Sequence, residues 1–299
     1  MRDEDGRPEV LVIGARGQLA RALQAASRRP GLPSVKAAGR PRLDLTAPET
    51  VEDMLRAHRP GVVINAAAWT DVEGAERNPE TALAINRDGA ATLARICARL
   101  DVPLIHISTD FVFDGTKGAP YTESDTPAPV NAYGESKLLG ERAVRGIAAR
   151  SMVIRVSWLH GPTGENILTR LFRLASGPPP GRIRVATDRI SSPTWTPGLA
   201  EDLLRIASTL PGRPASDPAW DTWHLADAGG CSLFELARAA FSAPDMPDVE
   251  PALMRDFPGM ARRPHDTRLE CERIRRFFTL PLREWQAAFA KPTPPSCTG

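Results

Sequence analysis

The fold is decided by Glu9-Val10-Leu11-Val12-Ile13-Gly14-Ala15-Arg16-Gly17-Gln18-Leu19-Ala20. Its apolar first half is brief and ends in glycine, which is typical of a buried strand in a parallel sheet. Helical periodicity follows over residues 18–27. Glycines at 14 and 17 permit a tight turn between these two segments. The stretch therefore predicts a strand, a glycine loop of the form GxxGxxA, and a helix.

The same alternation continues through the first half of the chain. Further strands are expected at residues 35–38, 61–67, 103–108 and 152–156, with helices between them, notably at 80–100 and 131–149. Repeated alternation of strand and helix gives a parallel sheet covered on both faces. The expected fold class is α/β, a Rossmann-type doubly wound parallel sheet with a smaller C-terminal substrate-binding region.

The pattern loosens after Trp158, where many of the 29 prolines lie. Residues 1–157 are expected to form the dinucleotide-binding Rossmann domain, with parts of 183–210 returning to the sheet. Residues 158–290 are expected to be mainly substrate-binding, since ligands of open α/β sheets bind at the carboxyl ends of the strands. The tail at 291–299, rich in proline and small polar residues, is expected to be flexible.

Composition excludes several classes of protein. The 299 residues are 25% charged with a net charge of +2, and the basic residues are spread along the chain, so no nucleic-acid partner is expected. The four cysteines form no CxxC pair, which argues against a zinc site or a disulfide framework. No apolar run is long enough to span a membrane, and the first residues are polar. A cytoplasmic protein without a membrane partner is expected.

The glycine loop directly follows the first strand of a long alternating series, where it favours a dinucleotide over a plain structural turn. Its helix N-terminus would receive the pyrophosphate. The second strand ends in Ala37-Ala38-Gly39-Arg40-Pro41-Arg42, without the acidic residue that holds the ribose of NAD. Arg40 could clamp a 2′-phosphate, so NADPH is preferred and NADH is the alternative; a surface arginine at a turn is the competing interpretation. Asp44 is placed to approach the adenine ring.

A second motif supplies acid–base chemistry. Asn131-Ala132-Tyr133-Gly134-Glu135-Ser136-Lys137 begins a helix and puts Tyr133 and Lys137 on one face. A free phenol has a pKa of about 10, and a nearby ammonium group would lower it. The fourth strand ends in the hydroxyls of Ser108 and Thr109, at the edge of the sheet where a substrate oxygen could bind.

These motifs resemble the extended short-chain dehydrogenases, and most closely the dTDP-4-dehydrorhamnose reductase family. The resemblance rests on the glycine loop, Asn65-Ala66-Ala67-Ala68, Ser108-Thr109-Asp110-Phe111-Val112-Phe113-Asp114-Gly115 and Tyr133-Gly134-Glu135-Ser136-Lys137. It extends to Arg189-Ile190-Ser191-Ser192-Pro193-Thr194 and Arg263-Pro264-His265-Asp266-Thr267-Arg268-Leu269. The run from Ser108 to Gly115 is the most specific of these motifs.

The resemblance implies hydride transfer from the nicotinamide to the C4 ketone of a dTDP-linked keto-deoxysugar. Tyr133 would protonate the oxygen, Thr109 would hydrogen-bond it, and Lys137 would lower the phenol pKa and hold the nicotinamide ribose. The other expected cofactor contacts are Gly14, Gly17, Gln18, Leu19, Arg40, Asp44, Leu45, Ala66, Ala67, Ala68, Trp69 and Thr70. The expected sugar-side contacts are Val72, Thr109, Asp110, Phe111 and Trp158.

Two departures from the family pattern bear on the substrate and on metal binding. Phe111 stands where many members carry tyrosine, which leaves the particular sugar open. Ala22 lies near the position of an acid through which some members bridge dimers by magnesium, so no metal is expected. A reductase of another nucleotide sugar and a non-catalytic regulatory subunit, like that of methionine adenosyltransferase, remain alternatives. A homodimer is compatible with the amphipathic helices but not required by them.

Two clusters receive plainer interpretations. His106, mid-strand among apolar neighbours, is expected to be a core histidine. Asp71, Glu73 and Glu76 follow the third strand and are expected to cap and solvate the next helix.

Overall fold

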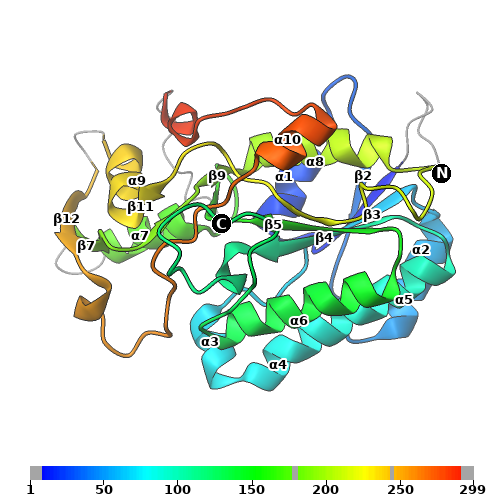
Figure 1. Ribbon diagram of the computed structural model, residues 1–299, viewed down its shortest axis with the longest axis horizontal. Coiled ribbons are helices and arrows are strands. Elements are labelled where there is room, and N and C mark those ends of the chain that lie inside the picture. The colour runs from blue at the N-terminus through cyan, green and yellow to red at the C-terminus, as the bar shows by residue number, and fades with distance from the viewer. Residues whose placement is uncertain (1–8, 177–180, 243–245, 291–299) are drawn as a thin grey trace.

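The computed structural model describes residues 9–176, 181–242 and 246–290. Six parallel strands form a central sheet in the order β10-β5-β4-β3-β1-β2 (Figure 1). They are β1 Val10–Ile13, β2 Val35–Ala38, β3 Val62–Asn65, β4 Leu104–Thr109, β5 Ser151–Val156 and β10 Thr222–His224. The strand order reverses between β1 and β3, and open sheets bind ligands at such a switch point. The expected doubly wound Rossmann-type fold is confirmed.

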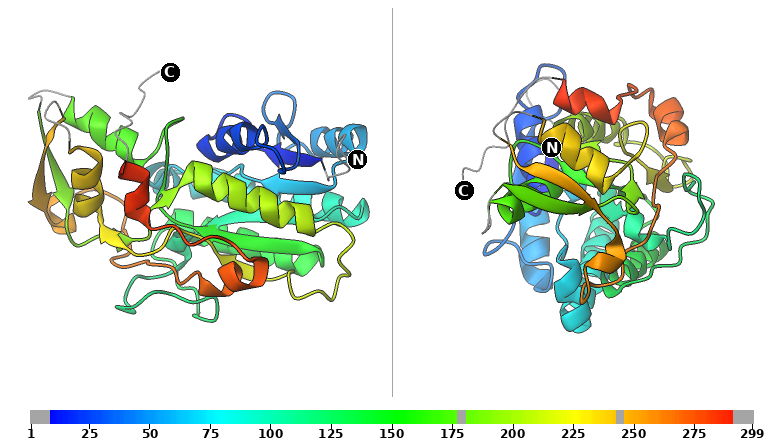
Figure 2. Two further views of the ribbon diagram at one scale, coloured as in Figure 1. Left: turned by 90° about the horizontal axis from the view of Figure 1, so that it is seen from above. Right: turned by 90° about the vertical axis from the view of Figure 1, so that its left-hand side faces the viewer.

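Helices cover both faces of this sheet (Figure 2). One face carries α1 (Gln18–Ala26), α8 (Thr196–Thr209) and α10 (Glu272–Phe278). The other carries α2 (Pro48–His58), α5 (Ala90–Arg99) and α6 (Ala132–Ile147). Val10 and Val12 pack on the first face, and Leu11 and Ile13 on the second, which explains why β1 is apolar at every position.

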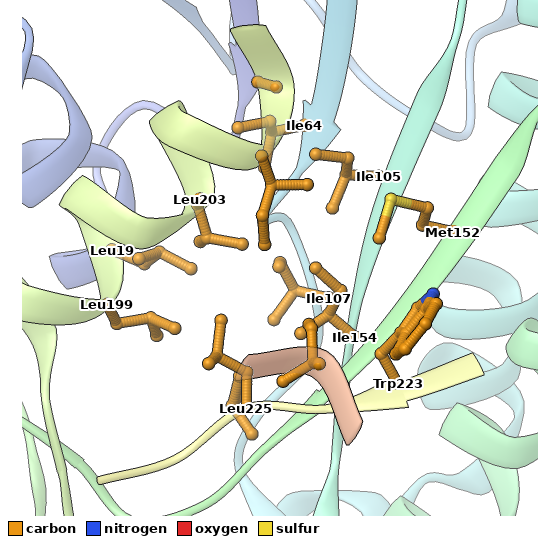
Figure 3. Packing of buried hydrophobic residues seen from close by; sticks show 14 of the residues in the cluster. Leu19, Ile64, Ile105, Ile107, Met152, Ile154, Leu199, Leu203, Trp223 and Leu225 are labelled. Carbon is orange, nitrogen blue, oxygen red and sulfur yellow. The ribbon is translucent and has the colours of Figure 1, made fainter. Parts of the chain in front are cut away.

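Leucines of α1 and α8 fill the first face against isoleucines of β3, β4 and β5 (Figure 3). Leu19, Leu199 and Leu203 are each at most 5% exposed. Burial of one such side chain stabilises the fold by about 1.5–3 kcal/mol. This layer fixes the start of α1, and with it the glycine loop, against the sheet.

The helical stretch expected at 80–100 is interrupted. It consists of α4 (Pro79–Leu83), a π-helical turn (Ala84–Gly89) and α5, and is preceded by the short α3 (Val72–Arg77). A Cβ at residue 89 would lie 2.8 Å from Leu45 Cβ, so glycine is needed there for the turn to approach the chain after β2. The π turn directs the Asn86 side chain inward, where it is 1% exposed.

A smaller lobe lies beyond the carboxyl end of β5, on the left of Figure 1. Its core is formed by α7 (Ile167–Ala175), β7 (Arg182–Ala186), α9 (Leu233–Ala240) and β12 (Asp248–Ala252). Four short strands form two further two-stranded sheets. One pairs β6 (Leu159–His160) with β9 (Thr194–Trp195), and the other pairs β8 (Ile190–Ser191) with β11 (Cys231–Ser232). Short 3-10 helices occur at Asp110–Val112, Met254–Asp256 and Trp285–Phe289.

The second half of the chain also contributes to the sheet. Helix α8 lies on its first face, and β10, from residues after 210, forms its edge beside β5. The expectations for the amino-terminal residues and for the tail at 291–299 concern residues outside the described ranges. Within the ranges described, every helix is too short or too polar to cross a membrane.

Candidate active site

The glycine loop is shaped by a close approach between two strand ends. Gly14 has a φ of +104°, and a Cβ there would lie 2.9 Å from the backbone nitrogen of Ala67. The side chain must therefore be absent for the loop after β1 to pass the loop after β3. Gly17 is the N-cap of α1, whose first turn contains no acidic side chain. This helix N-terminus suits a phosphate group.

A cavity of about 680 Å³ lies at the switch point, lined by the ends of β1, β2 and β3. Of the expected cofactor contacts, it is lined by Gly14, Gly17, Arg40, Asp44, Leu45, Ala66, Ala67, Ala68 and Trp69. Its size and its glycine-lined wall fit a dinucleotide.

Arginines stand at the rim of this cavity. Arg40 lines it as expected, and Arg16 of the glycine loop lines it as well. Both side chains are exposed. Asp44 accepts hydrogen bonds from the backbone nitrogen and hydroxyl of Thr46, at 2.9 and 2.8 Å, and these bonds hold its carboxyl pKa below the usual value. Two guanidinium groups can bind a 2′-phosphate where an acid would bind ribose hydroxyls.

The second motif lies beside the end of β4. Asn131 caps α6 by accepting a hydrogen bond from the Gly134 nitrogen at 2.8 Å. A Cβ at residue 134 would overlap the carbonyl oxygen of Phe111, so glycine lets α6 pack directly on the loop after β4. The Tyr133 phenol thereby lies beside the Thr109 hydroxyl, and their interaction lowers the phenol pKa. The Tyr133 ring meets Phe111 edge-on, with ring centres 5.7 Å apart.

The protonation of this pair differs from the sequence-based expectation. Lys137 is 2% exposed, and its Nζ donates to the Ile107 carbonyl oxygen at 2.7 Å. Burial lowers the Lys137 pKa to about 8, against the smaller opposing effect of the Glu141 charge. Burial raises the pKa of Tyr133 to about 12. The interaction with the Thr109 hydroxyl lowers this pKa, and the charge of Asp110 raises it. Tyr133 is therefore a protonated phenol at neutral pH, suited to donating a proton.

Comparison with known proteins places this chain in a family. Residues 8–293 match the family described as RmlD substrate binding domain. The chain belongs to the RmlD family. A relative from Mycobacterium tuberculosis, named dTDP-4-dehydrorhamnose reductase, is 40% identical and spans 95% of this chain and 92% of its own length. A relative from Streptomyces niveus, named dTDP-4-keto-6-deoxy-D-glucose reductase, is 34% identical, with coverage of 95% and 96%.

The fold of a solved RmlD family structure agrees as well. The crystal structure of dTDP-4-dehydrorhamnose reductase from Bacillus anthracis, in complex with NADP, superimposes with a TM-score of 0.85 at 31% identity. It covers 95% of this chain and 97% of its own.

Not every residue that the RmlD resemblance suggested for cofactor contact lines the cavity with its side chain. The Leu19 side chain lies in the core (Figure 3), and Thr70 is exposed on the loop before α3. The Gln18 amide donates to the Leu159 carbonyl at 3.1 Å and accepts from the Thr196 hydroxyl at 3.3 Å. Gln18 thus connects the cofactor loop to the second half of the RmlD chain.

Asp110 differs from its expected role as a sugar contact. Its carboxylate is 2% exposed, and Oδ2 accepts from the hydroxyls of Ser157, Ser191 and Thr267 at 3.0, 3.0 and 2.5 Å. The other oxygen accepts from Thr109 at 3.1 Å. These hydroxyls come from three distant segments, so the Asp110 side chain joins the smaller lobe to the loop that carries Thr109.

The expectation for the acidic residues after β3 is also corrected. Asp71 is the N-cap of α3 but makes no side-chain capping bond. Glu73 instead forms an ion pair with Arg263 at 2.7 Å and accepts from the Ala261 nitrogen, and Glu76 accepts from the Ala132 nitrogen. They bind the segment around Arg263 and the start of α6. His106 is confirmed as a core residue, bonded to Asn65 at 3.1 Å.

Proposed function

We propose that this chain is an NADPH-dependent reductase of the C4 ketone of a dTDP-4-dehydro-6-deoxy-L-hexose, the dTDP-4-dehydrorhamnose reductase reaction of dTDP-rhamnose biosynthesis. Membership of the RmlD family and the names of its relatives support this activity. One observation carries it: the protonated Tyr133 phenol lies beside the Thr109 hydroxyl, with Lys137 one helical turn away, at the same edge of the sheet as the glycine-lined cavity.

Bound NADPH would supply the hydride to the ketone carbon. The developing negative charge on the ketone oxygen then needs a proton and a hydrogen bond. Tyr133 would transfer its phenolic proton to that oxygen, and the Thr109 hydroxyl would hold the oxygen in place. The Lys137 ammonium group, fixed by the Ile107 carbonyl, would hold the nicotinamide ribose and favour the phenolate that remains.

We assign the cofactor to Gly14, Gly17, Arg40, Asp44, Leu45 and the segment Ala66–Ala68, all of which line the cavity. Residues 1–157 would hold this dinucleotide, and the smaller lobe would supply most of the sugar site. Arg16 and Arg40 support NADPH over NADH. Val72, Phe111 and Trp158 stay proposed contacts on the sugar side.

The test is NADPH oxidation, followed at its near-ultraviolet absorbance, with enzymatically generated dTDP-4-dehydro-6-deoxy-L-hexose. Tyr133→Phe keeps the ring and its contact with Phe111 but removes the proton, so kcat should fall about 10²- to 10⁴-fold while NADPH still binds. Wild-type kcat in the phenylalanine variant would contradict the assignment of the proton donor.

A second substrate belongs in the same assay. The Streptomyces niveus relative and the phenylalanine at position 111 both favour testing the dTDP-4-keto-6-deoxy-D-glucose isomer in parallel. Faster turnover of that sugar would move the chain to a neighbouring pathway without changing the chemistry. Cofactor binding without reduction of either sugar would favour the regulatory role instead.

We also propose the cellular compartment and the oligomeric state of the enzyme. NADPH and nucleotide sugars are cytoplasmic metabolites, so we place the enzyme in the cytoplasm. A homodimer is compatible with the fold, and sedimentation of the purified chain would decide between one copy and two.

A further inference from the structure

The guanidinium group of Arg189 has no hydrogen-bond acceptor in the part of the chain that the structure describes. It lies between β7 and β8, and its guanidinium carbon is 5.3 Å from the centre of the Trp158 ring and 5.5 Å from that of Phe111. Across residues 9–176, 181–242 and 246–290, no carboxylate or carbonyl oxygen pairs with it. Two other arginines on the side of the smaller lobe form ion pairs: Arg263 pairs with Glu73, and Arg268 pairs with Asp266. Arginines withdrawn from water are usually paired, and Arg189 is partly buried, so its guanidinium group is available to a ligand.

The surroundings of Arg189 favour an anion. Burial lowers its pKa to about 10, and the charge of Arg263 lowers it further while Asp110 opposes this. Among the described residues, Asp110 is the carboxylate whose charge acts on Arg189, and hydroxyl groups already engage this carboxylate. The Phe111 and Trp158 rings both lie against the guanidinium group and shield it in part from water, which strengthens its attraction for negative charge. The position therefore has uncompensated positive charge.

Arg189 is also correctly placed relative to the reacting centre. The Phe111 ring that it covers is the same ring that meets Tyr133. In a pyranose, C1 lies across the ring from C4. A sugar with its C4 oxygen at Tyr133 therefore directs its C1 phosphate away from the phenol. Trp158 has a φ of +38°, an uncommon left-handed conformation for a non-glycine residue that is often found at binding sites.

We propose that Arg189, held between Phe111 and Trp158, binds the diphosphate of the nucleotide sugar. The planar guanidinium group can donate two parallel hydrogen bonds to phosphate oxygens, which an ammonium group cannot match. This inference rests on the proposed function and adds the residue that would select a diphosphate-linked sugar over a free one.

Thymidine diphosphate alone is the probe, because its binding requires no turnover. Calorimetric titration of the full chain should give a dissociation constant for thymidine diphosphate about 10- to 100-fold higher in Arg189→Met than in the wild type. Thymidine should bind both proteins equally, since it has no phosphate. With the keto-sugar as substrate, KM should rise by a similar factor while kcat changes little, because Arg189 would bind the diphosphate and not the oxygen that receives the proton.

Three further variants act as controls. Arg182→Met, on the exposed face of β7, should leave thymidine diphosphate binding and turnover unchanged. Arg40→Met should weaken NADPH binding without affecting thymidine diphosphate. If the methionine variant does not fold, Arg189→Lys replaces it, because lysine keeps the charge and most of the packing. This variant should still bind thymidine diphosphate several-fold more weakly than the wild type.

The outcomes separate this inference from the proposed function. Equal binding of thymidine diphosphate by wild type and Arg189→Met overturns the inference, even if the wild type reduces the keto-sugar. Failure of the wild type to bind thymidine diphosphate overturns it as well. Binding that depends on Arg189 supports it, and if neither keto-sugar is then reduced, the proposed reduction fails while the diphosphate site stands.

Discussion

Tyr133 and Lys137 divide the acid–base work in a way that their spacing alone does not reveal. Burial affects the two side chains in opposite directions, because it disfavours the charged form of each. The phenol, with its pKa raised to about 12, keeps its proton. The ammonium group, with its pKa lowered to about 8, is the member that titrates near neutral pH.

The pH dependence of the reaction should therefore report Lys137. As pH rises through about 8, Lys137 loses its proton and its charge, so kcat/KM for reduction should fall tenfold per pH unit above that point. Measurement of kcat/KM between about pH 6 and pH 10 checks this. In Lys137→Arg the side chain stays charged throughout, so the residual activity should lack this fall. The same alkaline fall in both proteins would assign it to another group.

At the scale of the element, the π turn at Ala84–Gly89 matters most for the cofactor side. Asn86 accepts from the Trp69 nitrogen at 2.8 Å and donates to the Trp69 carbonyl at 3.0 Å and to Ser136 at 2.9 Å. One side chain thus pairs both backbone groups of Trp69, in the half-buried loop that lines the cavity, and attaches this loop to α6. An uninterrupted α-helix would direct residue 86 elsewhere.

Asn86→Ala should damage both stability and cofactor binding. It leaves the nitrogen and the carbonyl of Trp69 unpaired, which should cost about 2–4 kcal/mol in the free energy of unfolding, and NADPH should bind less tightly because the loop loosens. Urea denaturation and NADPH titration measure the two effects. Ser232→Ala is the matched control, because it removes the side-chain cap of α9, worth about 1 kcal/mol, and neither Ser232 nor its partner Glu235 lines the cavity. Unchanged NADPH affinity in Asn86→Ala would argue against this role.

The elements also show how far the sequence determines this fold. The strands β1 to β5 are recognisable because short apolar runs end at glycine or polar residues, and β2 lies at the expected residues. β10 is not recognisable: Thr222-Trp223-His224 is three residues long and becomes a strand by pairing with β5. The π turn also depends on tertiary contacts, those of Asn86 and Gly89.

The candidate site also contains some residues that the sequence predicts and others that only the folded chain brings together. Tyr133, Lys137 and Thr109 follow from local motifs, and so does the glycine loop. The partners of Asp110 could not be foreseen, because Ser157, Ser191 and Thr267 are brought together only by folding. Arg189 opens a motif that the sequence shows, but only the structure places it, partly buried, against Phe111 and Trp158 with no acceptor among the described residues.

At the scale of the whole molecule, a buried charge cluster holds the C-terminal segment to the sheet. Arg283 donates to Asp202 of α8 at 3.2 Å and to Asp227 at 3.3 Å, and these two carboxylate side chains are 0% and 2% exposed. Asp227 also accepts from the Trp195 nitrogen at 2.7 Å. Burial raises the pKa of both carboxyl groups, and the guanidinium group opposes this.

Arg283→Met should destabilise the protein by about 3–5 kcal/mol at neutral pH, because two buried carboxylates lose their counter-charge. A carboxyl group whose pKa is raised in the folded state binds more protons folded than unfolded. The penalty is therefore small below the unfolded pKa and grows as pH rises. Denaturation at about pH 5 and pH 8 should show a larger deficit at the higher value. Arg276→Met, at an exposed pair with Glu272, should show little change at either pH. A deficit independent of pH would contradict this account.

The strand β10 makes the two halves of the chain mutually dependent, because it completes the sheet only after the chain has passed through the smaller lobe. A chain cut between Ala175 and Arg182 would leave the first fragment with an uncovered edge at β5 and a bare apolar face where α8 belongs. Neither fragment would hold a finished core, yet together they contain every surface needed to reassemble. The architecture thus lends itself to fragment complementation, with NADPH oxidation reporting when two separately expressed pieces meet.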